Sequence, residues 1–365
     1  MKKRLVSALL CLAMAATMLV GCGGSEATEE TTEATEETAE ATEDVLTIVA
    51  GIGASGNALN AIAEDQGFLE EEGIKLEFEK IDGATDNFTA LSAGKIDMVF
   101  NCGTNTPLQY IASGDDFTIH GGFMLTGAMP VIAKVDTEWN SVEDFIGSTI
   151  AAFADTYALT GPLLDLGYDP VNEIKWLEMD NYTDRVSAVV SGEADYAVLG
   201  TGQAYQVNQM DNVKVVAYLG DLTPNYSCCR VVSKTEFLED ETNQEAVKRL
   251  YKAWLRAQAI FEEDRDYAAE VTAEQIGEDV EFVSAFMSNP DYQLNVDPYK
   301  NAVVRAWGWM DQLGCFKSDI SNINIEDHIN TEIYKSALDE CVAEHYDENP
   351  EFWDKMVTMY EEGDM

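Results

Sequence analysis

A glycine-rich stretch, Gly51-Ile52-Gly53-Ala54-Ser55-Gly56, follows a short apolar run and precedes a helical pattern. This G-x-G-x-x-G spacing matches the dinucleotide fingerprint, in which glycines let the backbone approach a pyrophosphate at a helix N-terminus. Two other interpretations compete with it: a tight turn without a ligand, and a loop that binds a small solute. Ser55 or Asn57 can cap the helix that follows.

The cysteines and histidines do not form a metal-binding pattern. The sequence has seven cysteines and three histidines, and no cysteine pair has the CxxC spacing of a zinc site. Five cysteines lie beyond the N-terminal stretch: Cys102, Cys228, Cys229, Cys315 and Cys341. We expect no metal and no cofactor. Outside the cytoplasm a disulfide is permitted, and Cys315 with Cys341 is the favoured pair, while a bond between Cys228 and Cys229 stays open.

The N-terminal stretch predicts export and lipidation. Met1-Lys2-Lys3-Arg4 is a positive n-region, Leu5–Val20 is apolar, and Gly21 leads into Cys22. This pattern is a secretory signal with a bacterial lipobox, so residues 1–21 are expected to be removed and Cys22 to carry lipid. A retained membrane anchor is the alternative, although the apolar stretch is short for a span. An exported protein does not meet a nicotinamide pool, which argues against the dinucleotide interpretation.

Residues 22–44 form an acidic segment of Glu, Thr and Ala with no large apolar side chain. Such a composition cannot bury a core, and its like charges extend the chain. We expect a disordered tether, with a charged helix as the alternative. The formal net charge of the whole chain is −45, so nucleic acid is excluded as a partner, because phosphate binding needs a basic footprint.

Beyond residue 45 apolar strand patterns alternate with helical patterns, which predicts α/β architecture in two lobes. An internal echo supports the two lobes. Leu91–Phe100 and Val190–Leu199 each read as a helix end, a glycine, an aspartate three residues later and an apolar strand that runs into Gly-Thr. The Gly-Thr loops contain Thr104 and Thr201, which either bind a solute or cap the next helix.

The last third of the chain is expected to be helical. The expected helices are Gln244–Glu263, Tyr267–Ile276, Phe282–Met287, Tyr299–Leu313 and His328–Ala343. Their tryptophans, Trp254, Trp307 and Trp309, are interpreted as core residues.

Several phrases together resemble a known family. They are Ala63–Leu69, Gly73-Ile74, the two helix-Gly-x-x-Asp units and Ser141–Ala151. In this order and spacing they resemble the solute-binding lipoproteins of ABC importers for nitrate, taurine and aliphatic sulfonates. They are also similar to the binding proteins for thiamine-pyrimidine precursors.

The resemblance implies a type II periplasmic-binding-protein fold, in which two α/β lobes enclose a cleft and a helical part follows. Lobe 1 would comprise residues 45–130 and return in residues 226–365 with the C-terminal helices, and lobe 2 would comprise residues 131–225. The chain would cross between lobes near Thr126–Val131 and Tyr218–Arg230. The implied protein is no enzyme. It is a monomer that is lipid-anchored on the outer face of the cell membrane, and its partners are a small solute, a permease and an ATPase.

The implied cleft lies at the carboxyl ends of the strands, where open α/β sheets bind ligands. The loops there offer hydroxyl, amide and aromatic groups for a small polar or anionic solute. The expected ligand-binding residues are Gly53, Ser55, Asn57, Asn101, Cys102, Thr104, Asn105, Asp155, Thr156, Tyr157, Tyr182, Thr201, Gln203 and Tyr226. Arg185 and Arg230 are the nearby basic residues, and each is expected to pair with a surface carboxylate.

The solute stays open between sulfonate-, taurine- or nitrate-like anions and thiamine-pyrimidine-like molecules. Many sulfonate binders carry a Trp-Asp-Pro-like phrase where this chain has Gly200-Thr201-Gly202-Gln203. An enzyme resembling fungal thiamine-pyrimidine synthase is the alternative function, because that enzyme has a cysteine-rich phrase near the position of Cys228-Cys229. A dehydrogenase, with Asp82 on the ribose, is the third hypothesis.

Overall fold

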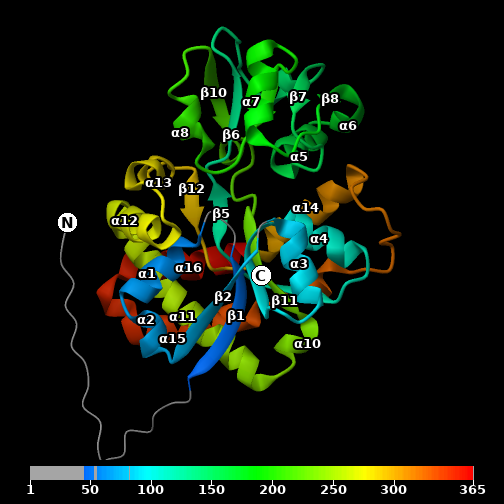
Figure 1. Cartoon of the computed structure of the whole chain (residues 1–365). Helices are drawn as coiled ribbons and strands as arrows, with labels where there is room; N and C mark the ends of the chain where they lie inside the picture. Colours follow the sequence, from blue (N-terminus) through cyan, green and yellow to red (C-terminus); the bar gives the residue numbers. More distant parts are fainter. Residues whose placement is uncertain (1–44, 53–55, 82, 365) are drawn as a thin grey trace, which may run out of the picture. The chain divides into compact units, whose positions relative to one another are not determined.

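The structure is a computed structural model, and it describes residues 45–52, 56–81 and 83–364. The predicted lipid site Cys22, the acidic tether, Asp82 and two expected site residues, Gly53 and Ser55, lie outside the described residues. Two five-stranded sheets carry the architecture, each surrounded by helices (Figure 1).

The first sheet has the strand order β2-β1-β3-β11-β4. Its strands are β1 (Leu46–Ile52), β2 (Ile74–Lys80), β3 (Met98–Gly103), β4 (Phe117–Gly122) and β11 (Cys229–Lys234). β1 pairs in parallel with β2 and β3, whereas β11 runs antiparallel to β3 and β4. The carboxyl ends of β1 and β3 therefore lie at the same edge.

The second sheet has the strand order β10-β6-β9-β7-β8. Its strands are β6 (Pro130–Lys134), β7 (Thr149–Ala151), β8 (Lys175–Trp176), β9 (Tyr196–Val198) and β10 (Val213–Tyr218). β7 pairs in parallel with β8 and β9, and β6 runs antiparallel to β9 and β10.

The chain passes between the two sheets twice. The first crossing, residues 123–129, leads from β4 to β6 and contains β5 (Met124–Gly127), which pairs antiparallel with β12 (Tyr292–Leu294). The second crossing, residues 219–228, leads from β10 to β11 and begins with α9 (Leu219–Leu222). The two crossings are hydrogen-bonded to one another, because the Cys228 N–H donates to the Leu125 carbonyl over 2.9 Å.

Short helices connect the strands. Around the first sheet lie α1 (Ala58–Asp65), α2 (Phe68–Glu71), α3 (Ala84–Ser92), α4 (Asn105–Ala112) and α10 (Thr235–Leu238). Around the second lie α5 (Tyr157–Asp165), α6 (Pro170–Glu173), α7 (Tyr182–Ser191), α8 (Gln203–Val207) and the 3-10 turn η1 (Val142–Phe145).

The helical last third agrees with expectation to within a few residues. Its helices are α11 (Glu241–Glu263), α12 (Arg265–Ile276), α13 (Val280–Met287), α14 (Lys300–Gln312), α15 (Glu332–His345) and α16 (Pro350–Gly363), with 3-10 turns η2 (Ile325–His328) and η3 (Tyr346–Glu348). α16 was not expected. Trp254, Trp307 and Trp309 are buried, which confirms their interpretation as core residues.

The internal echo has a structural cause. Gly94 and Gly192 take left-handed backbone conformations just after α3 and at the end of α7, which a side chain would disfavour. The carboxylate of Asp97 then accepts a hydrogen bond from the Val49 N–H over 2.8 Å, and the carboxylate of Asp195 accepts one from the Thr149 N–H over the same distance. Each aspartate thus fixes the strand neighbouring its own.

The expected Cys315–Cys341 disulfide is wrong, because all five cysteines of the described residues are free thiols. Cys341 is buried on α15, with its Sγ 3.8 Å from the Lys252 carbonyl oxygen of α11, and Cys315 is only partly buried. In the part of the chain that the structure describes, no helix combines the length and apolarity needed to cross a membrane.

Candidate functional site

A cavity of about 580 Å³ lies where the two sheets, both crossings and the C-terminal helices meet. Its size suits a small organic ligand. The lining residues are Gly103, Phe123, Met124, Met129, Tyr182, Gly200, Thr201, Gln203, Cys228, Cys229, Ile276, Glu278, Phe282, Phe286 and Tyr292. Most of these side chains are aromatic, aliphatic or sulfur-containing.

The second sheet contributes the loop that follows β9 and the start of α7. Gly200 lies directly against the side chain of Tyr182, because a Cβ at Gly200 would fall 2.7 Å from two ring carbons and from the hydroxyl oxygen of Tyr182. Only glycine leaves room for the tyrosine ring in this arrangement. Thr201 and Gln203 complete this wall, and the next helix, α8, packs against α13.

The opposite wall comes from the C-terminal helices. Phe282 and Phe286 project from α13, and Tyr292 begins β12. The rings of Phe282 and Phe286 lie 5.7 Å apart and those of Phe286 and Tyr292 lie 5.3 Å apart, both edge to face. Such edge-to-face series are favoured by the ring quadrupoles. The sequence predicted these helices but not their place in the site, because aromatic residues at helical spacing equally suit a core.

Glu278 is the single charged residue among the described residues that line the cavity, and its side chain is exposed. The two candidate arginines do not line the cavity. Arg185 donates to the carbonyls of Met179 and Val198, each over 2.7 Å, and lies 5.3 Å from the Tyr182 ring centroid. Its burial lowers the pKa of the guanidinium. The expected pairing of Arg185 with a surface carboxylate is therefore wrong.

Arg230 is fully buried and, like Arg185, is hydrogen-bonded to backbone carbonyls. Its guanidinium donates to the carbonyls of Asp297, Pro298 and Met124 over 2.8, 3.1 and 2.9 Å. It thereby joins the first crossing to the segment that precedes α14. Because these bonds use backbone carbonyls, the expected surface carboxylate is absent here too, and Arg230 is not among the residues that line the cavity.

Three of the expected ligand-binding residues line the cavity: Tyr182, Thr201 and Gln203. Cys102, Thr104 and Tyr157 are buried beside the second crossing and Tyr226 is buried within it, and none of these four residues lines the cavity.

The hydroxyls near the second crossing are engaged with protein atoms. The Tyr157 hydroxyl donates to the carbonyls of Tyr226 and Ser227 over 3.0 and 3.1 Å, and the Tyr226 hydroxyl accepts from the Gly127 N–H over 3.1 Å. These bonds leave little of either tyrosine hydroxyl for a solute.

The two threonines of the echo hold the crossings. The Thr104 hydroxyl donates to the Ser227 carbonyl of the second crossing. The Thr201 hydroxyl donates to the Gly127 carbonyl of the first crossing over 2.6 Å. Thr104 precedes α4 without a side-chain capping bond, and the residue that caps α8 is Gly202. Helix capping therefore does not explain either hydroxyl.

The remaining expected residues have other surroundings. Asp155, in the loop after β7, accepts from Asn105 over 3.2 Å and from Gln109 over 3.1 Å, so this loop of the second sheet is bonded to α4. Thr156 directly precedes α5. The Asn57 side chain caps α1, which confirms its expected capping role. Asn101 lies within β3.

Packing explains the two glycines of the G-x-G-x-x-G stretch that the structure describes, Gly51 and Gly56. A Cβ at Gly51 would fall 2.0 Å from the Asn87 side chain of α3. Gly56 has a positive φ, and a Cβ there would fall 2.4 Å from Ile276. Both glycines therefore allow close approach of neighbouring protein groups. Among the described residues there is also no cluster of side chains that could hold a metal ion.

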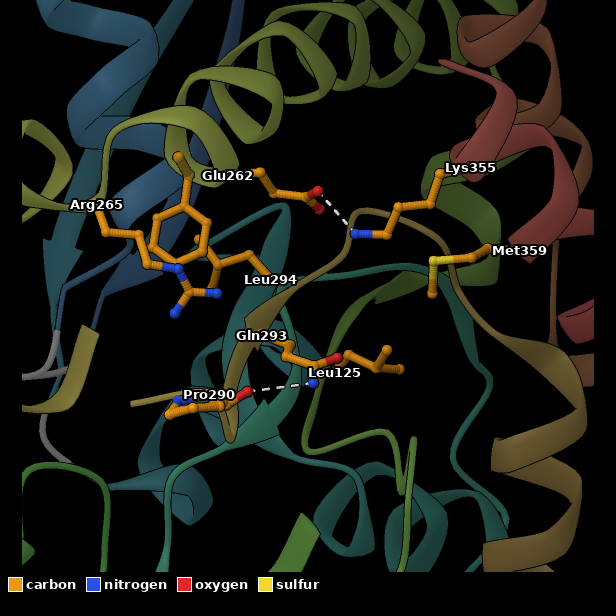
Figure 2. Close-up of a pocket in the computed structure, with 9 residues that line it drawn as sticks. Leu125, Glu262, Arg265, Pro290, Gln293, Leu294, Lys355 and Met359 are labelled. Atoms are coloured by element: carbon orange, nitrogen blue, oxygen red, sulfur yellow. Dashed lines mark hydrogen bonds and ion pairs between the residues drawn. The ribbon is translucent and has the colours of Figure 1, made fainter. Parts of the chain in front are cut away.

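A second cavity, of about 330 Å³, lies beside β12 (Figure 2). Its charged groups are satisfied by protein atoms: Lys355 is paired with Glu262 over 2.7 Å, as Figure 2 shows, and Arg265 donates to the carbonyls of Met287, Asn289 and Tyr292. Arg265 is therefore a positioning residue, because it fixes the segment from α13 to β12 that carries Phe286 and Tyr292 into the larger cavity.

Comparison with known proteins gives a family match. The model of the family described as "NMT1/THI5 like" matches residues 58–267, which is more than half of the chain. No curated protein matches the chain by sequence.

Solved structures share the fold at low identity. The periplasmic aliphatic sulphonate-binding protein SsuA of Escherichia coli is 16% identical with a TM-score of 0.61, over 74% of this chain and 88% of that one. The periplasmic nitrate-binding protein NrtA of Synechocystis PCC 6803 is 15% identical with a TM-score of 0.65, over 82% of this chain and 89% of that one. The desulfurization enzyme DszB also has this fold, with a TM-score of 0.55 and 16% identity over 82% of this chain and 99% of that one. The expected periplasmic-binding-protein fold is thus confirmed.

Proposed function

Because the chain belongs to the NMT1/THI5-like family and has the periplasmic-binding-protein fold, we propose that it is the solute-binding lipoprotein of an ABC importer. Lipid on Cys22 holds it outside the cell membrane, and it delivers a small solute to a permease. The observation that carries this proposal is the cavity of about 580 Å³, whose walls come from both sheets and from the crossings between them.

The capture mechanism follows from this arrangement. A solute that contacts the Tyr182 wall and the Phe282 wall at once favours the arrangement in which the two walls are close. Ligand contacts on both sides of a hinge are the general cause of cleft closure. The crossings, held by Thr104 and Thr201, are the segments about which the two sheets would rotate.

The lining favours one of the two expected solute chemistries. A buried sulfonate or nitrate needs a positive partner, because an unpaired charge out of water is costly. No described lining residue is basic, and the one carboxylate, Glu278, would repel an anion. Five aromatic side chains instead offer faces and edges to a flat ring. We therefore favour a pyrimidine-like, planar aromatic solute that is uncharged or cationic over a sulfonate-, taurine- or nitrate-like anion.

The proposed role needs no chemistry on the solute. Histidine is a common catalytic acid or base, but His120 is fully buried away from the cavity lining. It is hydrogen-bonded to Ser233 and Tyr251, and burial lowers its pKa to about 3. The alternative, an enzyme similar to thiamine-pyrimidine synthase, would alter its ligand. Recovery of a bound ligand unchanged by mass after long incubation supports the binding protein, and a changed mass supports the enzyme.

A thermal-shift screen tests the solute class. The panel pairs thiamine-type pyrimidines and nucleobases with taurine, alkanesulfonates and nitrate. At one hundred times the dissociation constant a bound solute adds about 2.7 kcal/mol of stability, which raises the unfolding midpoint visibly. We expect a rise with aromatic members only. A rise with the oxyanions alone would overturn the solute class while leaving the binding function intact, and no rise with any small molecule would count against the function itself.

A further inference from the structure

Two adjacent thiols share the wall of the cavity. Cys228, the last residue of the second crossing, and Cys229, the first residue of β11, both line it. Their sulfur atoms lie 3.7 Å apart, with the Cys229 thiol donating to the Cys228 sulfur. Both residues are free thiols, and they are only 7% and 5% exposed. Reagents from solution therefore reach them through the cavity.

This arrangement is unusual for neighbours in sequence. Successive side chains of an extended strand point to opposite faces, so adjacent cysteines in a regular strand would be separated. Here the preceding backbone is turned, with positive φ at both Asn225 and Ser227. Hydrogen bonds hold the turned segment: the Cys228 N–H donates to Leu125, and the Cys228 carbonyl accepts from the Thr104 N–H. The two thiols are thus held together before any reaction.

The surroundings of the two sulfurs differ. Hydrogen bonds from the Cys229 thiol and the Tyr226 hydroxyl, together with the Arg230 charge, lower the pKa of the Cys228 thiol. The pKa of Cys229 is raised, because its thiol donates to Cys228 and is buried. A third thiol close by, Cys102, has its pKa raised to about 12 by burial. The thiolate is the reactive form, so Cys228 is the attacking sulfur.

We propose that Cys228 and Cys229 are a thiol–disulfide exchange site on the wall of the solute cavity. The Cys228 thiolate attacks one sulfur of a small disulfide RSSR, the S–S bond of RSSR breaks, and RS⁻ leaves. The Cys229 sulfur gives up its proton and attacks Cys228, which releases the second RS⁻. Two protein thiols are oxidised to one disulfide, RSSR is reduced to two RSH, and the protons end on the two leaving thiolates.

The exchange would reshape the cavity. A disulfide brings the two sulfurs from 3.7 Å to about 2.05 Å, so the wall at Cys228 and Cys229 must shift. If the chain binds a solute here, as proposed above, the solute covers both thiols and slows the exchange. The exchange itself does not depend on the proposed function, because it needs only the cavity and the two sulfurs.

Peptide mapping tests the site in the full chain without any solute. Trypsin releases Val215–Arg230 as one peptide that contains both cysteines. The reduced protein is treated with oxidised glutathione, blocked with iodoacetamide and digested. We expect this peptide to be lighter by two hydrogen atoms and to carry no iodoacetamide label. Cys341→Ser, the matched control, should give the same result.

Single variants separate the two roles. In Cys229→Ser the mixed disulfide on Cys228 cannot be resolved, so glutathione should remain bound to this peptide. In Cys228→Ser the remaining thiol of the pair, Cys229, has a raised pKa, so iodoacetamide should label it slowly. Circular dichroism checks that both variants are folded. Two results in the unaltered protein would overturn the proposal: a peptide labelled at both cysteines after oxidation, or a disulfide that links it to the Cys102 peptide.

Discussion

At the scale of single residues, the hydroxyls of Thr104 and Thr201 were predicted in part from the sequence. The echo placed both threonines after matching strands, and the structure uses each hydroxyl to hold one crossing. The sequence could reveal the repeat because a glycine, an aspartate and a threonine recur at fixed spacing. It could not reveal the acceptors, Ser227 and Gly127, because these lie far along the chain.

Thr104→Val tests the role of Thr104 in holding the second crossing. Valine keeps the shape and removes the donor, so the Ser227 carbonyl loses a buried hydrogen bond. We expect the free energy of unfolding of the solute-free protein to fall by about 0.5–1.5 kcal/mol. Urea unfolding followed by circular dichroism measures it. Thr89→Val, at a more exposed helix position of α3, is the control, and equal stability of Thr104→Val and the unaltered protein would contradict this role.

Asp297 and Asp364 form a buried carboxyl pair with a predictable pH dependence. Burial and the mutual repulsion of the two groups raise the pKa of Asp297, and burial raises that of Asp364. In the unfolded chain the pKa of an aspartate is about 3.9, its model-peptide value. Above that pH the unfolded state loses its protons first, so this pair stabilises the fold at low pH and its contribution is lost as the pH rises towards the folded pKa values.

Asp364→Asn should therefore flatten the pH dependence of stability. The amide cannot ionise and can donate to Asp297, so the variant gains stability relative to the unaltered protein as the pH rises from 4.5 to 7.5. Urea unfolding across this range gives the difference, with Asp211→Asn at an exposed turn as the control. A difference that is constant with pH would argue against raised pKa values in this pair.

At the scale of elements, periodicity predicted most strands and helices, and the resemblance placed three residues on the cavity wall. The aromatic wall of α13 and β12 was missed for a physical reason. The position of a loop at the carboxyl end of a strand predicts a binding site. Phe282 and Phe286 have no such signal, because they differ from core aromatic residues only in the segment that packs beside them. That neighbour, the Gly200 loop, lies about eighty residues away in the sequence.

Phe282→Leu tests the aromatic wall. Leucine keeps much of the volume but removes the ring face and the edge contact with Phe286. An aromatic contact is worth about 0.5–1.5 kcal/mol beyond its area, so the affinity for an aromatic solute should fall several-fold. Calorimetric titration measures the affinity, with Phe316→Leu beside Trp307, outside the lining, as the control. An unchanged affinity in Phe282→Leu would remove this wall from the site.

At the scale of the whole molecule, the proposed role requires the protein to stay at the membrane. Cys22→Ser removes the lipid acceptor that the lipobox predicts. We expect the variant to move from the membrane fraction to the soluble fraction when cells are broken and fractionated, with Cys341→Ser remaining at the membrane. Retention of Cys22→Ser at the membrane would instead support an uncleaved anchor.

The central claim is that a small solute binds in the cavity between the two sheets. The most direct measurement is a calorimetric titration of the solute found by the thermal-shift screen into three proteins: the unaltered chain, Gly200→Ala and Gly308→Ala. A Cβ at Gly200 meets the Tyr182 ring, whereas one at Gly308 on α14 meets nothing within 4 Å. We predict that Gly200→Ala weakens binding about tenfold, or 1.4 kcal/mol, and that Gly308→Ala binds as the unaltered chain does. Equal affinity in all three proteins would contradict the claim.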